Sequence, residues 1–383
     1  MTADAHPLTQ LLDTKRVVIT VGAGGVGKTT TAAALGVAAA QRGKRVLCLT
    51  IDPAHRLAQS LGLERMTTEA KVVDPAPFAA AGGPLKGQLT VMMLDTKATF
   101  DELVTRHSST PERAKKLLEN QLYKYVSTQL AGTQEYMAME KLVLVQKDPR
   151  YDLILLDTPP TTNALDFLDA PGRMIEALDS ATMRWFIEAF ESTGKVSLNL
   201  LARSAAVVLR GIGKLVGGGF LEAMAEFITS LNDLFGGFRT RAAVLEKTLR
   251  SPDVAFVLVT SPSPVSIQEV LYFEGRLREA KMPRGAFVVN RVREAPRVAD
   301  RPVRPEDVAR AIHERKVCLD ADAPGRVLRA YEDASKLAAL DARNLGSLTS
   351  RAEGLPVVRI PELPTDVHDA KGLVKLSAML TAG

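Results

Sequence analysis

Short runs of apolar residues, each bounded by turn residues, recur along the chain and predict buried β-strands. Several of these runs are apolar at nearly every position, as expected for strands that are covered on both faces of a parallel sheet. Segments with helical spacing lie between the runs, so the alternation predicts an α/β fold with a doubly wound, mostly parallel sheet. The predicted strands are Arg16–Val21, Arg45–Ile51, Leu89–Asp95, Leu153–Asp157, Val254–Thr260, Ala286–Asn290 and Val357–Ile360.

The alternation stops between Asp157 and Val254, where apolar residues at helical spacing form two stripes and predict amphipathic helices. We therefore predict a single domain over residues 1–383, with an α-helical insertion at 164–250 that is a candidate subdomain for binding a client or a partner. The same stripes fit helices that pack on the body of the domain or on a partner subunit. They comprise Met183, Phe186, Ile187 and Phe190, and then Phe220, Met224, Phe227, Ile228, Leu231, Leu234, Phe235 and Phe238.

A complete phosphate-binding loop, Gly-Ala-Gly-Gly-Val-Gly-Lys-Thr, follows the first predicted strand at Gly22–Thr29. The Ala-rich helix predicted over Thr30–Ala40 comes next, and this order points backbone N–H groups and a helix N-terminus at phosphate oxygens. We expect Lys28 to reach the β- and γ-phosphates of ATP and the Thr29 hydroxyl to bind Mg²⁺. The other expected contacts to the nucleotide are Gly24, Gly25, Val26, Gly27 and Thr30.

Further polar residues end or follow predicted strands, at the edge where doubly wound sheets bind ligands. Asp157 ends an apolar strand, as a Walker-B aspartate does, and is expected to hold Mg²⁺ through a coordinated water. Asp52 follows the second strand and is expected to position the attacking water, although it also suits the N-cap of the next helix. Asn290 ends the sixth predicted strand at the same edge.

The composition restricts the class of protein. Only two cysteines, Cys48 and Cys318, are present, which excludes a disulfide framework and a four-cysteine zinc site within one chain. We expect Cys48, inside a predicted strand, to be a small core residue. No apolar run approaches the roughly 20 residues needed to span a bilayer, and the N-terminus lacks the pattern of a signal peptide. The sequence thus predicts a cytoplasmic protein without stable membrane insertion.

The net charge of +5 is small for 383 residues and gives little support for nucleic acid as a partner. A basic stretch follows the fifth predicted strand, but acidic residues are mixed into it and aromatic residues are absent from it. This pattern predicts a solvated surface and does not favour a nucleic-acid interface. The arginines concerned are Arg284, Arg291, Arg293, Arg297, Arg301 and Arg304.

Together these motifs resemble the arsenite-pump and tail-anchored-protein-targeting ATPases, the ArsA/Get-type family of the SIMIBI class of P-loop NTPases. Beside the phosphate loop, Asp52-Pro-Ala-His-Arg-Leu57 resembles the switch I of that family, and Asp157-Thr-Pro-Pro-Thr161 resembles its switch II. Phe287-Val-Val-Asn-Arg291 resembles the strand whose asparagine contacts adenine, which implies this role for Asn290. Ile360–Val367 resembles the late loop near the base.

The resemblance covers nearly the whole chain in the order of the family. It implies a dimeric, Mg²⁺-dependent ATPase in which the nucleotide closes two subunits and moves their helical regions. It also implies the handling of a hydrophobic protein client, such as a tail-anchored membrane protein.

The chain departs from the family pattern at Ala23, where the family usually has a lysine that reaches the partner's nucleotide across the dimer. A homodimer would lack this cation, whereas a heterodimer with a homologous, lysine-bearing subunit would regain it. The family's Cys-x-x-Cys is also absent, so no zinc is expected. Two alternatives stay open: a weakly hydrolysing regulatory subunit of a heterodimer, and a partition-type ATPase that positions cargo on DNA or a membrane.

Overall fold

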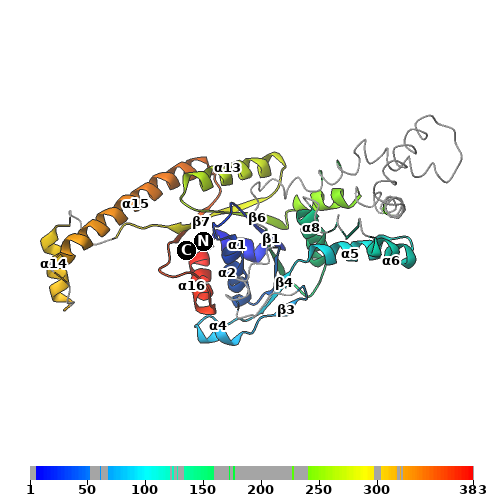
Figure 1. Cartoon of the computed structure of the whole chain (residues 1–383), viewed down its shortest axis with the longest axis horizontal. Helices are drawn as coiled ribbons and strands as arrows, with labels where there is room; N and C mark the ends of the chain where they lie inside the picture. Colours follow the sequence, from blue (N-terminus) through cyan, green and yellow to red (C-terminus); the bar gives the residue numbers. More distant parts are fainter. Residues whose placement is uncertain are drawn as a thin grey trace, which may run out of the picture.

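A single sheet organises the part of the chain that the computed structural model describes, namely residues 6–51, 61, 68–120, 123–124, 127, 133–158, 172, 176, 227, 240–296, 303–316, 320 and 322–382. Within these ranges the strand order is β3-β4-β2-β5-β1-β6-β7-β8 (Figure 1). Neighbouring strands are parallel, apart from the antiparallel pair of β3 and β4. The predicted doubly wound, mostly parallel sheet is therefore confirmed.

Every strand predicted from the sequence is present, although some ends shift by a few residues. β7 has nine residues where five were predicted, because Arg284 still pairs with β6 at one end and Val292 still pairs with β8 beyond the bulge at the other. β3 was not predicted, since two exposed residues are too few to show a period. The strands are β1 (Val17–Val21), β2 (Arg45–Thr50), β3 (Lys71–Val72), β4 (Gln88–Met93), β5 (Leu153–Asp157), β6 (Val254–Thr260), β7 (Arg284–Val292) and β8 (Val357–Pro361).

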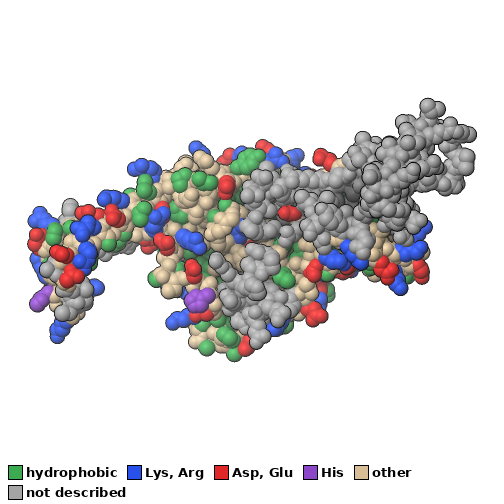
Figure 2. Space-filling model, viewed as in Figure 1, with side chains coloured by type: hydrophobic (Ala, Val, Ile, Leu, Met, Phe, Trp, Pro, Cys, Tyr) green, Lys and Arg blue, Asp and Glu red, His purple; other side chains and the backbone are tan. Residues whose placement is uncertain are grey.

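Helices cover both faces of the sheet (Figure 1). One face carries α1 (Pro7–Thr14), α2 (Lys28–Gln41), α4 (Ala76–Ala80) and α16 (Ala370–Thr381). The other carries α5 (Thr96–His107), α6 (Pro111–Glu119), α8 (Thr133–Gln146), α13 (Pro264–Glu279) and the C-terminal part of α15 (Ala323–Arg351). The remainder of α15, with α14 (Pro305–Glu314) packed on it, extends away from the sheet as an arm (Figure 1). Basic and acidic side chains both lie on the visible surface of this arm (Figure 2).

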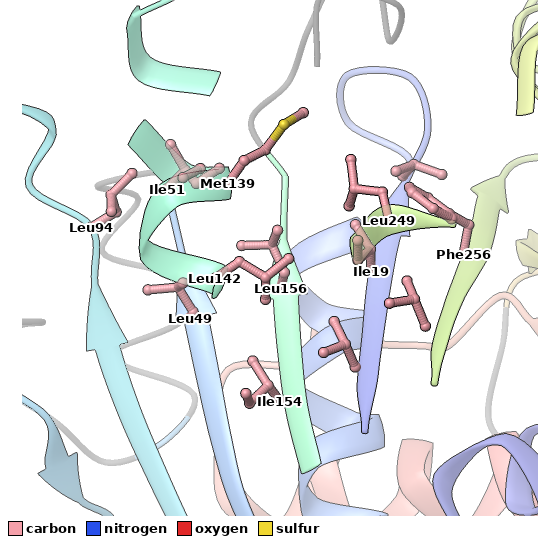
Figure 3. Close-up of a cluster of buried hydrophobic side chains, with 14 of the residues drawn as sticks. Ile19, Leu49, Ile51, Leu94, Met139, Leu142, Ile154, Leu156, Leu249 and Phe256 are labelled. Carbon is pink, nitrogen blue, oxygen red and sulfur yellow. The ribbon is translucent and has the colours of Figure 1, made fainter. Parts of the chain in front are cut away.

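The alternation of side chains along each strand divides the core into two clusters, one on each face of the sheet. On the α8 face, Ile19, Leu49 and Leu156 come from the three central strands and are fully buried. Leu49 and Leu156 lie beneath Met139 and Leu142 of α8, and Ile19 lies beneath Leu249 (Figure 3). Because both faces are covered, these strands are apolar except near their ends, which is the pattern that predicted them.

The helical insertion predicted at 164–250 falls largely outside the described residues. Phe227 is the one residue of the two apolar stripes that the structure describes, and it is 7% exposed and belongs to the α8-face cluster. At this position the stripe packs on the body of the domain. In the described part of the chain, no helix combines the length and the apolar character that crossing a membrane would require.

Helix α2 lies very close to the sheet. It begins at Lys28, two residues before the predicted start, and its Ala-rich sequence leaves little side-chain volume between helix and strands. A methyl group added at Gly36 would come within 2.6 Å of the Cys48 sulfur and 3.2 Å of a methyl carbon of Leu155. Burial raises the pKa of the Cys48 thiol to about 12, so this cysteine is an unreactive core residue, as predicted.

The close approach of α2 to β2 gives a stability prediction. Gly36→Ala gains about 1 kcal/mol of helix propensity but forces a displacement of packed groups that costs about 1–3 kcal/mol. We expect a net loss of about 1 kcal/mol and a lower midpoint of thermal unfolding by circular dichroism. Adding Cys48→Ala removes the sulfur and should make the Gly36→Ala change neutral or stabilising in that background. A Gly36→Ala single variant that melts above the wild type would contradict this packing.

Candidate active site

The phosphate loop connects β1 to the N-terminus of α2 at the carboxyl edge of the sheet. Gly27 is the N-cap residue of α2 and has a φ of 95°, in the left-handed region that favours glycine. Lys28, in the first turn, is 5% exposed, and its Nζ donates a hydrogen bond of 2.8 Å to the carbonyl oxygen of Ala23. The ammonium group thus lies across the loop, next to the helix N-terminus, where an anion is favoured.

The Asp157 carboxylate lies beside this loop and is 2% exposed. Its Oδ2 accepts a hydrogen bond of 2.6 Å from the Thr29 hydroxyl of α2 and one of 3.1 Å from the Thr50 hydroxyl of β2. The register of the sheet explains the second contact, because Asp157 pairs with Thr50 on one side and with Thr20 on the other. The Thr20 hydroxyl lies 3.5 Å from Asp157 Oδ1. Three hydroxyls therefore surround one buried carboxylate.

These groups fit a magnesium ion bound with a phosphate ester. Mg²⁺ prefers oxygen ligands and is usually held by one or two side chains together with water and substrate phosphates. The Thr29 hydroxyl and the Asp157 carboxylate are adjacent, and both face the N-terminus of α2, where phosphate oxygens would be held. Thr20 and Thr50 are the residues that sequence reasoning missed; their signal was a threonine near the end of each of two otherwise apolar strands.

Asn290 reaches the phosphate loop from β7. Its Nδ2 donates a hydrogen bond of 3.0 Å to the carbonyl oxygen of Val26, and its Oδ1 accepts one of 3.0 Å from the backbone N–H of Arg291. The register with β8 shifts between Val289 and Val292, and Arg291 has a φ of 60°. Asn290 and Arg291 thus form a β-bulge, a feature that redirects side chains and is frequent beside functional sites.

A pocket of about 300 Å³ opens between the bulge and the helix N-terminus. Gly27 and Thr30 form its wall on the α2 side, and Asn290 and Arg291 form the wall on the β7 side. The end of β8 and the segment after it form the third side with Pro361, Glu362, Leu363, Thr365, Asp366 and Val367. The pocket is therefore continuous with the phosphate loop, and part of the late loop identified in the sequence lines it.

The structure brings most of the predicted site residues to one edge of the sheet. Lys28, Thr29 and Asp157 form one group, and Asn290 lies beside Gly27. Gly24 and Gly25 are exposed in the loop. Asp52 lies outside the described residues, directly after Ile51, so its role stays a prediction.

Two arginines of the basic stretch are not simply solvated, contrary to the expectation from the sequence. Arg293 forms an ion pair with Asp341 of α15, whose side chain is 3% exposed. Arg284 forms an ion pair with Glu274 of α13, whose side chain is 4% exposed. The sequence pattern missed these pairs because the acidic partners lie outside the basic stretch, 10 and 48 residues away on α13 and α15.

Comparison with protein families gives a match over most of the chain. The family model described as "Anion-transporting ATPase" matches residues 15–302. This range includes the phosphate loop, Asp157 and Asn290.

Among individual proteins, the chain is 26% identical over 245 residues to ATPase GET3 of Malassezia globosa, which covers 61% of this chain and 64% of that protein. It is 26% identical over 239 residues to ATPase GET3 of Mycosarcoma maydis, covering 60% and 62% of the two chains. With ATPase GET3 of Phaeosphaeria nodorum it shares 24% identity over 296 residues, covering 76% and 81%. The chain thus spans somewhat less than two thirds of the length of the first two relatives.

The geometry of the loop predicts unequal effects of two glycine substitutions. Gly27→Ala places a methyl group against the Asn290 amide and forces alanine into the left-handed region, which alone costs about 1–2 kcal/mol. We expect the affinity for a Mg²⁺–nucleoside triphosphate to fall by at least about tenfold, because both walls of the pocket must shift. Affinity is measured by isothermal titration calorimetry.

Gly25→Ala is the matched control. Gly25 also has a positive φ, 76°, but an added methyl group meets nothing within 4 Å. We expect a smaller loss of affinity than for Gly27→Ala. Equal losses in the two variants would show that the contact between Gly27 and Asn290 is not important for binding.

Proposed function

Because this chain belongs to the anion-transporting ATPase family, we propose that it is a Mg²⁺-dependent ATPase whose active site lies at the N-terminus of α2. The family match confirms the resemblance found in the sequence motifs. The observation that supports the proposal most strongly is the hydrogen bond of 2.6 Å between Thr29 of the phosphate loop and the buried Asp157 carboxylate. It joins the phosphate-binding and metal-binding groups that phosphoryl transfer requires.

In this proposal the residues of the chain act mainly by position and charge, as is usual for phosphoryl transfer. The backbone N–H groups of the loop and the Lys28 ammonium bind the β- and γ-phosphate oxygens. Thr29 and Asp157 would hold Mg²⁺, Thr29 through its hydroxyl and Asp157 through a water molecule. The metal ion, when bound, neutralises negative charge on the β- and γ-phosphates. Asp52 is proposed to orient the attacking water.

The pocket beside the loop is proposed to hold the adenine base. Within the described residues, Asn290 uses one of its two amide N–H groups on Val26 and one lone pair of Oδ1 on Arg291. Another N–H and another lone pair remain in the same amide plane, and this combination matches N6 and N7 of adenine. Asn290 thus connects the base to the phosphate loop.

We further propose that ATP drives the handling of a hydrophobic protein client by a dimer in the cytoplasm. The resemblance to tail-anchored-protein-targeting ATPases and the names of the GET3 relatives support this task. The α-helical insertion at 164–250 is the proposed client-binding or partner-binding subdomain. At Phe227 its stripe packs on the body of the domain, so the surface offered to a client would be formed by other residues.

A second candidate function is that of a regulatory subunit in a heterodimer with a homologous ATPase. Ala23 favours it, because its methyl group cannot supply the cation that the family usually places there. A cation that reaches the transition state from a partner contributes several orders of magnitude to the rate in related P-loop enzymes.

One prediction of the proposed function concerns Asp157. Asp157→Asn keeps the size of the side chain but removes the charge, so we expect kcat for ATP hydrolysis to fall by about 100-fold or more, because several kcal/mol of transition-state stabilisation depend on the metal. Steady-state phosphate release is measured over a range of Mg²⁺ concentrations. Full Mg²⁺-dependent activity in this variant would refute the proposed role of Asp157.

Asp152→Asn is the matched control, because Asp152 directly precedes the same strand at its opposite end. There it forms an exposed ion pair of 2.6 Å with Arg45. Exposed pairs of this kind contribute about 0–1 kcal/mol to stability, so this variant should retain the wild-type kcat.

Another prediction separates a self-sufficient ATPase from a subunit that needs a partner. Ala23→Lys should raise kcat by about tenfold or more in an ATP-dependent dimer, because it restores a cation at the subunit boundary. Ala23→Gln, which adds length without charge, is the control and should leave kcat near the wild-type value. Turnover is measured together with light scattering. An unchanged rate in Ala23→Lys would mean that another residue supplies the cation and would remove the argument for a lysine-bearing partner.

A further inference from the structure

A buried carboxylate in the middle of α15 holds the segment that follows the β7 bulge. The side chain of Asp341 is 3% exposed. Its Oδ2 accepts hydrogen bonds from the backbone N–H of Arg293 at 2.9 Å and from the Arg293 Nε at 3.1 Å, and its Oδ1 accepts one from Nη2 at 3.1 Å. Both oxygens are thus bonded to a single residue, which fixes its backbone as well as its side chain.

Arg293 lies two residues after the least favourable backbone conformation of the candidate site. Arg291 is a non-glycine residue with a φ of 60°, which persists only where the surroundings impose it. On one side of Arg291, Asn290 is bonded to the phosphate loop. On the other side, the carbonyl oxygen of Val292 accepts a hydrogen bond of 2.9 Å from the backbone N–H of Glu362, and Arg293 is held by Asp341. The bulge is therefore held from both ends.

The contacts form a continuous path from α15 to the phosphate loop. Asp341 binds Arg293, the bulge directs the Asn290 amide, and this amide binds the Val26 carbonyl next to Gly27. Asn290, in the middle of this path, lines the pocket of about 300 Å³ between the bulge and α2. The Asp341 side chain is buried, whereas that of Arg293 is 41% exposed. A buried carboxylate requires hydrogen-bond donors, and Arg293 supplies three of them, so the conformation of the segment after the bulge depends on Asp341.

We propose that the Arg293–Asp341 pair is a positioning element that sets the Asn290 amide for the nucleotide base and joins the pocket to the α14–α15 arm. This inference rests on the proposed function, in which Asn290 contacts adenine. Neither residue lines the pocket, so both act through Asn290. Since α15 continues from Asp341 into the arm seen in Figure 1, the same pair links the base side of the site to that arm.

The test compares a ligand that has a base with one that has none. Asp341→Asn removes the charge that holds both Arg293 groups, so we expect the Kd for Mg²⁺–ATP to rise about tenfold. Mg²⁺–tripolyphosphate has no base to place against Asn290, so its Kd should stay within about twofold of the wild-type value. Both are measured by isothermal titration calorimetry on the full chain. A merely structural role would raise the Kd of both ligands equally, and that result would overturn the proposal. An unchanged Kd for Mg²⁺–ATP would also overturn it.

Glu353→Gln is the matched control. Glu353 lies two residues beyond the C-terminal end of α15, where it forms an exposed ion pair with Arg278 of α13 and lies 3.9 Å from Arg284 at the start of β7. This variant weakens the attachment of the same helix far from the bulge, so it should leave the Kd of both ligands unchanged. A tenfold loss of ATP affinity in Glu353→Gln would mean that any loosening of α15 suffices, and the specific role of Asp341 would be lost.

A double-mutant cycle tests whether Asp341 acts through Asn290. Asn290→Ala alone should weaken ATP binding and spare tripolyphosphate. In that background, Asp341→Asn should cause no further loss, because the amide that it positions is gone. An equal tenfold loss in both backgrounds would show that Asp341 acts by another route.

Arg293→Lys provides a second variant if Asp341→Asn does not fold. It keeps the charge and the backbone N–H but loses the bidentate contact of the guanidinium group. We therefore expect the Kd for Mg²⁺–ATP to rise about threefold and the Kd for Mg²⁺–tripolyphosphate to stay unchanged. The absence of a selective loss of ATP affinity in this variant would overturn the proposal. Failure of the proposed function is distinguishable, because the wild-type chain itself would then bind neither ligand.

Discussion

The buried carboxylate of Asp157 is the group on which the arrangement of the active site depends. A carboxylate that is 2% exposed is tolerated only when hydrogen bonds replace the lost water. Here the donors are hydroxyls from three different elements: Thr20 of β1, Thr50 of β2 and Thr29 of α2. One buried charge is thus contacted from β1, β2 and α2, so it joins the ends of these elements to the end of β5 beside the phosphate loop.

The sequence revealed the parts of the molecule whose signals are local. The pattern alone identified the mainly apolar strands, the loop from Gly22 to Thr29, and Asp157 at the end of an apolar strand. β3 was missed because it has only two residues. The bulge at Arg291 and the pairing of Arg293 with Asp341 were missed because their causes lie in partners distant in sequence.

The role of Asp52 and the fold of the insertion at 164–250 stay predictions. Asp52 falls outside the described residues, as does most of the insertion. Periodicity shows that a segment forms amphipathic helices but not which surface their apolar stripe contacts. Phe227 illustrates this, because its place in a stripe suited a client groove as well as packing on the body of the domain. The structure places it in the core.

A structure of the chain bound to Mg²⁺ and a non-hydrolysable ATP analogue tests the central claim most directly. Our account predicts the metal ion on the Thr29 hydroxyl, with Asp157 bonded to one of its waters, and the adenine base against Asn290 in the pocket closed by the segment after β8. A nucleotide bound elsewhere, or a metal ion remote from both Thr29 and Asp157, would contradict it.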